Sequence, residues 1–250
     1  MQQAHALTPL LTEENPPSFP FLVVLVSGGH TQLVLAKSFH EYRIIADCLD
    51  SKIGHVGYVI RFTASLTCSD AYDKVARLLQ LPTSTQASGA VLEQFASLPP
   101  LPPYDTVPLP ALPKPLSSGQ HATSLQFSFS GLVSHVERVI ARLQTSADVT
   151  RIGQSGQILK GASRVEGEKA IHLDGATQRE LSKRFQDAAI GHLTSKIRLA
   201  LESADLKEVT GVVVSGGVAS NKALRQRCVA RLYCEALKHQ TNVQVTECTG

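Results

Sequence analysis

The stretch FLVVLVSGG at residues 21–29 decides the fold of this chain. Its six apolar residues, Phe21–Val26, form an unbroken run that is typical of a buried strand, and the two glycines after Ser27 predict a tight turn. A second apolar run, residues 209–214, ends in the same way, so that VSGG occurs at residues 26–29 and again at residues 214–217. Two buried strands that end in matching glycine loops indicate an α/β protein whose loops could bind one ligand from both sides.

The composition describes a globular chain with a sizeable core. Of its 250 residues, 43% are hydrophobic and 18% are charged, and the net charge of +3 is too small to predict a nucleic-acid-binding protein by itself. The longest apolar run is far shorter than a membrane span, and the sequence shows no secretory leader, so we expect no membrane association. Five scattered cysteines without a CxxC pair favour a reducing compartment, and no two histidines lie four residues apart.

The remaining pattern predicts alternating strands and helices. Two strand-like runs separated by polar residues indicate a hairpin, and a basic, amphipathic helix follows the second glycine loop. The predicted strands are residues 31–36 and 42–49, and the predicted helices are residues 70–81, residues 132–143, a long helix from Thr177 and a helix from about residue 220 to residue 238.

Two segments lack any periodicity. Residues 97–118 contain eight prolines and predict an extended surface loop, either a tolerated insertion or, less favoured, a PxxP ligand for an SH3-like domain. Residues 145–176 are rich in glycine and mixed in charge, which predicts a second loop or flexible insertion.

Each glycine loop can be interpreted either as an anion-binding loop or as an ordinary turn. Glycine lets backbone N–H groups converge on an oxyanion, serine adds a hydroxyl donor, and the helix after the second loop favours negative charge at its start. Either loop alone is more simply an ordinary turn, whereas the pair favours a nucleotide site. Neither copy matches a P-loop or the GxGxxG fingerprint.

Single polar residues near these loops also have two interpretations. Asp73 either binds a ribose hydroxyl or caps a helical turn, and Asn221 either contacts a ligand or starts the last helix; spacing alone favours the cap in both cases. The basic side of that helix could follow RNA phosphates, but without interleaved aromatic residues a solvated face is favoured. This basic side consists of Lys222, Arg225, Arg227, Arg231 and Lys238.

Four motifs together resemble one family. They are NPPSFPFLVVLVSGGHTQLVL at residues 15–35, DAYDKVARLL at residues 70–79, FSFSGL at residues 127–132 and VVVSGGVASNKALR at residues 212–225. In this order they resemble the TsaD-type, glycoprotease-like tRNA N6-adenosine threonylcarbamoyltransferases, and the likeness is closest to mitochondrial members. The resemblance implies an α/β fold, an RNase H-like lobe of the actin/Hsp70 (ASKHA) superfold with a mixed sheet and flanking helices.

The resemblance also implies a reaction and a set of binding residues. Family enzymes transfer the threonylcarbamoyl group from threonylcarbamoyl-AMP to N6 of the adenosine beside the anticodon in tRNAs that read ANN codons. No side chain stands out as a general base, so the catalytic residues stay unassigned. By this likeness the acyl-phosphate end of the substrate would lie on Leu25, Val26, Ser27, Gly28 and Gly29, its nucleoside or threonyl part on Asp73 and Asn221, and further contacts on Gly89, Gly216 and Gly217.

The departures from the family concern the metal and the length of the chain. The family holds one divalent metal ion, iron or zinc, with a His-x-x-x-His pair and a later Asp; only His5 matches a ligand, so we expect an incomplete site. We expect residues 1–18 to be a remnant of the metal-ligand helix and linker, and residues 19–245 to form one lobe of a two-lobed enzyme. Relative to the family, residues 55–69, 97–118 and 145–176 are interpreted as insertions, the first being a candidate retained intron. Gly89 is a gapped match to the family's PGG turn.

These expectations leave the activity of the chain open. We expect tRNA and threonylcarbamoyl-AMP as partners, a homodimer and a mitochondrial location, with no activity of this chain alone. The alternatives are a non-catalytic binding or regulatory lobe and the older family label of metalloendopeptidase, which one histidine without an HExxH glutamate disfavours. A sugar-kinase-like ATPase would share the superfold, but a fold does not determine a function.

Overall fold

The computed structural model describes residues 7, 10–11, 16–27, 29–51, 66–83, 86–99, 109–155, 173–203, 206, 208–216, 221–227 and 244–247, without the side chains of residues 51, 144–155 and 244–247. Its strands are β1 (Phe21–Val26), β2 (Thr31–Ala36), β3 (Tyr42–Cys48), β4 (Gln126–Phe127), β5 (Gly211–Ser215) and β6 (Gln244–Glu247). Its α-helices are α2 (Cys68–Leu78), α3 (Ser88–Ser97), α4 (Ser130–Ser155) and α5 (Gly175–Leu201), and two short 3-10 helices are η1 (Leu49–Ser51) and η2 (Gly119–His121). A further helical stretch covers residues 222–227.

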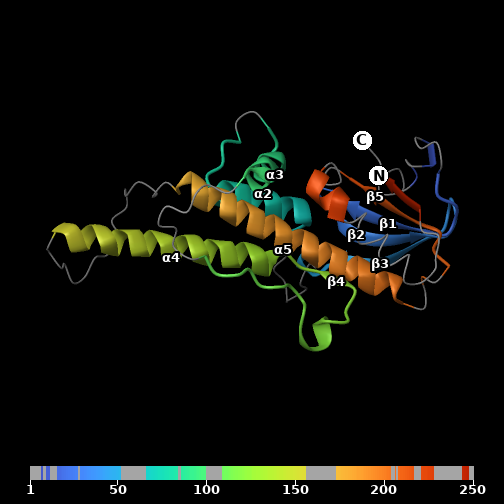
Figure 1. Cartoon of the computed structure of the whole chain (residues 1–250). Coiled ribbons are helices and arrows are strands. Elements are labelled where there is room, and N and C mark those ends of the chain that lie inside the picture. Colours follow the sequence, from blue (N-terminus) through green and yellow to red (C-terminus); the bar gives the residue numbers. More distant parts are fainter. Residues whose placement is uncertain are drawn as a thin grey trace, which may run out of the picture.

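The strands form one mixed sheet in the order β4-β3-β2-β1-β5-β6. β1 pairs antiparallel with β2, and β2 pairs antiparallel with β3, which confirms the predicted hairpin of β2 and β3. β5 pairs parallel with both β1 and β6. β3 and β4 are also parallel. The predicted α/β class with a mixed sheet and flanking helices is confirmed (Figure 1).

Alternate residues of the strands enter two different apolar clusters, because successive side chains of a strand point to opposite faces. Leu22, Val24 and Val26 of β1 belong to the large core that also contains the buried residues of α2, α3, α4 and α5. Phe21 and Val23 belong to a smaller cluster on the other face. The helices therefore share one core with this face of the sheet, while α3 packs mainly against α2 and α5.

Helix α2 starts earlier than its predicted first residue, Asp70. Thr67 is its N-cap and forms a capping box with Asp70, whose carboxylate accepts hydrogen bonds from the Thr67 backbone N–H and hydroxyl. The Cys68 backbone N–H donates to the hydroxyl of Thr31 on β2 at 2.9 Å. The last residues of the expected insertion 55–69 are thus bound to the sheet; residues 52–65 lie outside the described part of the chain.

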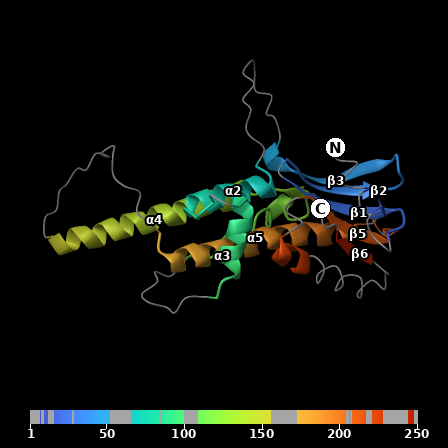
Figure 2. The same cartoon turned by 90° about the horizontal axis from the view of Figure 1, so that it is seen from above.

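The loop predicted from residue 145 begins later than expected, and this part of the prediction is wrong. Helix α4 continues through residues 145–155, because that stretch contains no proline and only one glycine, Gly153, so nothing in the backbone ends the helix. α4 runs antiparallel to α5 and continues past the point where α5 begins (Figures 1 and 2). Residues 156–172 lie outside the described part.

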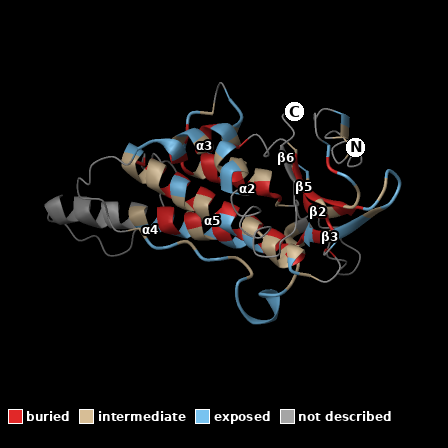
Figure 3. Cartoon of the chain, turned by 45° about the vertical axis from the view of Figure 1, so that its right-hand side comes forward, coloured by how far each residue is buried: buried red, intermediate tan, exposed pale blue. Residues whose placement is uncertain are grey.

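The described half of the proline-rich segment has no helix or strand up to η2, as its prolines predict. No residue of 109–121 is buried, and this loop lies along the exterior of the helices (Figure 3). Arg184 of α5 holds it in place: its guanidinium donates to the carbonyl oxygens of Leu109 and Pro110 at 2.6 and 3.0 Å. Residues 100–108 lie outside the described part.

Within the described helices, none is both long enough and apolar enough to cross a bilayer.

Candidate functional site

The two glycine loops touch at the sheet edge where β1 and β5 end. Leu25 and Ser215 are register partners in this parallel pair, so both loops leave the sheet at the same level. Gly216 has φ +105°, and a Cβ on it would lie 2.4 Å from the carbonyl oxygen of Val26 and 3.2 Å from the backbone N of Ser27. Only glycine fits this contact, because a side chain would meet backbone atoms that have no room to move.

The first loop is a tight turn between β1 and β2. The Ser27 backbone N–H donates to the His30 carbonyl at 2.8 Å, and the His30 N–H donates back to the Ser27 carbonyl at 3.4 Å. Gly29 is exposed, and no described atom lies within 4 Å of the position that its Cβ would take. Ser27 therefore uses its amide inside the turn, while the space beside Gly29 is open. Gly28 and Gly217 lie outside the described residues.

Asp73 and Gly89 form the second part of the site and come from different helices. An Asp73 carboxylate oxygen of α2 accepts a hydrogen bond from the Gly89 backbone N–H at 3.1 Å. Ala87, the N-cap of α3, has no side chain to satisfy the first amides of that helix, so Asp73 supplies the missing acceptor. Asp73 thus caps a helix, as spacing favours, but the helix is α3 rather than its own.

Asn221 starts the last described helix, which confirms its interpretation as a helix-start residue. Its side-chain oxygen accepts from the Leu224 backbone N–H at 2.8 Å, and its side-chain nitrogen donates to the Gln186 side-chain oxygen of α5 at 3.2 Å. The Lys222 backbone N–H donates to the Glu93 carboxylate of α3 at 2.7 Å. Asn221 is therefore connected to the helix that Asp73 caps.

The positive charge of the basic side predicted for this helix is partly neutralised by an ion pair. Lys222 is exposed, whereas Arg227 forms an ion pair with Asp187 of α5. Both partners of that pair are about half exposed, so the pair contributes little to stability but reduces the free positive charge. Arg231 and Lys238 lie outside the described residues.

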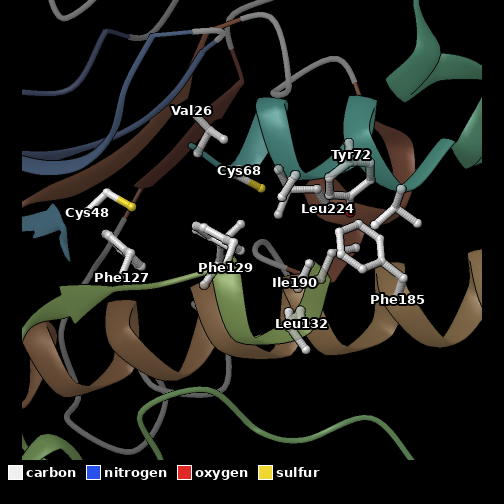
Figure 4. Packing of buried hydrophobic residues seen from close by; sticks show 14 of the residues in the cluster. Val26, Cys48, Cys68, Tyr72, Phe127, Phe129, Leu132, Phe185, Ile190 and Leu224 are labelled. Atoms are coloured by element: carbon white, nitrogen blue, oxygen red, sulfur yellow. The ribbon is translucent and has the colours of Figure 1, made fainter. Parts of the chain in front are cut away.

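Buried apolar side chains from the elements that carry the candidate site residues pack together (Figure 4). Val26 lies near Cys68 and Phe129, and Leu224 lies beside Tyr72, all of them less than 4% exposed. Burial, followed by the nearby Cys68 and Glu93, raises the pKa of Tyr72 well above its ordinary value, so this residue remains a neutral phenol.

Asp50 is a structural residue that the sequence analysis did not identify. One of its carboxylate oxygens accepts from the backbone N–H groups of Phe129 and Ser130 at 2.7 and 3.1 Å, and the other accepts from the hydroxyls of Ser128 and Ser130 at 3.0 and 3.1 Å. The FSFSG motif is thereby fixed to the end of β3. A serine-rich opening of a helix signals a cap, but nothing in the sequence names this distant carboxylate as the partner.

Lys196 is a buried charge outside the predicted site. Its ammonium group, on a residue that is 2% exposed, donates to the carbonyl oxygens of Leu116, His121, Ala122 and Ser124 at 3.3, 3.0, 3.5 and 2.8 Å. Burial lowers its pKa below the ordinary value. Four carbonyls around one ammonium fix the end of the proline-rich segment to α5.

His192 lies near both Asp50 and Lys196. Its Nε2 accepts the Ser128 backbone N–H at 3.1 Å, and the residue is 3% exposed. Burial, with the charge of Lys196, lowers the pKa of His192 to about 4, against an opposing contribution from Asp50. The imidazole is therefore neutral near pH 7, as its acceptor role requires.

The described residues do not fit a resident metal ion. Among them, no group of three or more His, Cys, Asp or Glu side chains lies close enough to hold one. His5, the ligand that the resemblance implies, lies outside the described part of the chain.

A mixed sheet whose two parallel strands end in touching glycine loops, with helices on one side, defines an α/β lobe; in this class of fold, ligands bind beyond the carboxyl ends of the strands. Residues 2–242 match the family described as tRNA N6-adenosine threonylcarbamoyltransferase, TsaD, and the chain belongs to this family, which confirms the predicted fold class and the resemblance. Metal dependence is a general feature of the family.

Two curated relatives agree with this assignment. A tRNA N6-adenosine threonylcarbamoyltransferase of Chromobacterium violaceum is 33% identical over 223 residues, covering 89% of this chain and 50% of the relative. The mitochondrial tRNA N6-adenosine threonylcarbamoyltransferase of Schizosaccharomyces pombe is 32% identical over 239 residues, covering 95% of this chain and 46% of the relative. The chain spans about half the length of the curated relatives it matches.

Proposed function

We propose that this chain is the substrate-binding lobe of an enzyme that transfers a threonylcarbamoyl group from threonylcarbamoyl-AMP to N6 of the adenosine beside the anticodon in ANN-decoding tRNAs. The observation that carries the proposal is the contact of Gly216 with Val26 and Ser27, because it joins the two family loops into one surface. In the reaction the adenosine N6 attacks the carbamoyl carbon, the bond from this carbon to the phosphate oxygen breaks, AMP leaves, and the N6 proton passes to solvent.

The proposed contacts follow from the positions of the described residues. In this proposal the acyl phosphate lies at the loop Ser27 to Gly29 and against Gly216. Leu25 and Val26, which are 2% and 0% exposed, hold this loop at the end of β1. Asp73, Gly89 and Asn221 contact the nucleoside or threonyl part from the helices beside the loops. Gly28, Gly217 and the candidate metal ligand His5 are carried over from the family.

The proposal also names partners and a location. The substrates are threonylcarbamoyl-AMP and tRNA, the protein acts as a homodimer with one iron or zinc ion per complete enzyme, and it functions in mitochondria. The mitochondrial relative in fission yeast supports the location, and the names of both relatives support tRNA as the substrate.

Binding of threonylcarbamoyl-AMP, measured by calorimetry, tests the site with Asp73→Asn. The asparagine oxygen can still accept the Gly89 N–H, so α3 keeps its cap while the site loses a negative charge. We expect a clear change in the dissociation constant without a change in the melting temperature. The matched control is Asp174→Asn, which alters the carboxylate cap at the start of α5. Unchanged affinity in Asp73→Asn would remove Asp73 from the site.

The activity itself is tested in cells. Depletion of the protein is expected to lower threonylcarbamoyladenosine in mitochondrial tRNAs that read ANN codons, measured by mass spectrometry of nucleosides. A normal level of the modified nucleoside after depletion would refute the proposed function.

A further inference from the structure

Two buried amide side chains meet at the start of the last described helix. Asn221 and Gln186 are each 5% exposed, and the Asn221 side-chain nitrogen donates to the Gln186 side-chain oxygen at 3.2 Å. Gln186 lies on α5, one residue after Phe185, whose ring packs edge-on against Tyr72 with centroids 5.1 Å apart. The acceptor for Asn221 is therefore provided by a well-packed part of α5.

The direction of the Asn221 amide is determined by the backbone. The Leu224 N–H is a donor and cannot change its role, so the Asn221 group that faces it at 2.8 Å must be the oxygen. The nitrogen then faces Gln186, and the Gln186 group that faces it must be the oxygen. These two consecutive hydrogen bonds therefore allow only one orientation of each amide.

This arrangement limits what Asn221 can offer to a ligand. Its oxygen is engaged by the helix and one of its two N–H hydrogens by Gln186, which leaves one N–H donor without a partner among the described residues. We infer that Gln186 is a positioning residue that holds the Asn221 amide so that it presents a single N–H to an acceptor atom of the substrate, such as a hydroxyl, carbonyl or phosphate oxygen. The inference rests on the proposed function for the identity of the substrate, but not for the geometry of the amide pair.

Three variants test the ligand-binding half of the inference, with threonylcarbamoyl-AMP as the probe in calorimetry. Gln186→Met keeps the size of the side chain but removes the acceptor, and we expect a dissociation constant about five- to tenfold higher. Asn221→Asp keeps the oxygen that caps the helix but removes the N–H donor, and we expect a similar increase. In the Asn221→Asp background, Gln186→Met should add nothing, because the donor that it positions is gone.

A conservative variant and a control separate positioning from general stability. Gln186→Glu keeps an acceptor oxygen and should retain affinity within about twofold of the original. The control is Gln178→Met, because Gln178 is also a buried glutamine of α5 but donates to the Leu79 carbonyl at 2.9 Å. Gln178→Met should lower stability and leave affinity unchanged. Additive losses in the double variant, or equal losses of affinity in both Met variants, would overturn the inference.

Hydrogen exchange tests the geometry without a ligand. In Gln186→Met the side-chain N–H signals of Asn221 should exchange at least tenfold faster in nuclear magnetic resonance spectra, while the Leu224 backbone N–H stays protected. Unchanged exchange at Asn221 would overturn the inference regardless of binding. If the exchange result is as expected but the unsubstituted protein does not bind threonylcarbamoyl-AMP, the amide geometry stands and the proposed function fails.

Discussion

Gly216 lies so close to Val26 that a Cβ on the glycine would be 2.4 Å from the carbonyl oxygen and 2.7 Å from the carbonyl carbon of the valine. The two residues are distant in the sequence but end neighbouring parallel strands. Because both sides of this contact are backbone, neither loop can shift without the other. The two glycine loops therefore form one structural unit at this end of the sheet.

Gly216→Ala should destabilise the protein strongly. The φ of +105° is unfavourable for a residue with a Cβ, and the new methyl group would overlap the Val26 carbonyl, so we expect a loss of at least about 3 kcal/mol in the free energy of unfolding. Urea denaturation measures this loss. Gly29→Ala is the control, because open space surrounds Gly29, and its effect should stay within about 0.5 kcal/mol. Equal effects of the two substitutions would show that the loop contact is not rigid.

Asp50→Ala should release the FSFSG motif from β3. The substitution removes the acceptor of two backbone N–H groups and two hydroxyls, which we expect to cost about 2–4 kcal/mol. Asp47→Ala is the control, because Asp47 is exposed and accepts from Gln32 and Cys48 where water can replace it, so we expect a loss of less than about 1 kcal/mol. Thermal unfolding of both variants measures the difference, and a stable Asp50→Ala protein would contradict the assigned role.

His192 should make the protein less stable in mild acid. Its pKa is about 4 in the folded protein against 6.5 ordinarily, so the unfolded chain binds the proton more readily, and stability should decrease as the pH falls from about 6.5 toward 4. We expect this residue to account for a loss on the order of 2–3 kcal/mol. His135, whose pKa burial also lowers, titrates in the same direction.

The His192→Gln variant isolates this contribution. A glutamine oxygen can accept the Ser128 N–H in place of Nε2 but binds no proton near neutral pH. The difference in unfolding free energy between variant and original, measured by urea denaturation from pH 7.5 to 4.5, should depend on pH. A constant difference across this range would show that His192 titrates normally.

Lys196→Met should loosen the segment from Leu116 to Ser124. The four carbonyls would lose their shared donor, and we expect a loss of about 2–4 kcal/mol together with faster proteolysis of this segment. The Lys196→Arg variant should also be less stable than the original protein, because a planar guanidinium cannot donate to four carbonyls placed around one point. Lys183→Met, at an exposed position of the same helix, is the control and should change stability by less than about 0.5 kcal/mol. Full stability of Lys196→Arg would contradict the need for a compact ammonium.

The strands were predictable because their signals are local. Phe21–Val26 and Thr31–Ala36 have the predicted bounds, since each is an apolar or alternating run that ends at glycine or at polar residues. Helix α3 was missed for the opposite reason. Its N-cap, Ala87, carries no capping group, and the acceptor that stabilises its start is Asp73, which belongs to another helix.

The candidate site was predictable as a set of residues but not as an arrangement. The repeated VSGG indicated two related loops, but the register of β1 and β5 and the positive φ of Gly216 are properties of the folded sheet. The hydrogen-bond partners of Asn221 and Lys222 could not be predicted from the sequence either. Its role at a helix start follows from the sequence, whereas Gln186 and Glu93 reach this helix start only because α3 and α5 pack beside it.

The parallel pairing of β1 with β5 has a consequence for synthesis of the chain. β1, β2 and β3 can pair as soon as they leave the ribosome, but the other edge of β1 has no partner until residues 211–215 follow. At translation rates of about 5–20 residues per second, a buried apolar strand keeps an open edge for roughly 10–40 s. An open edge of this kind recruits strands from other chains. The nascent protein is therefore most vulnerable to aggregation before β5 is made, and the closing hydrogen bond from the Thr210 N–H to the Pro20 carbonyl marks the end of that interval.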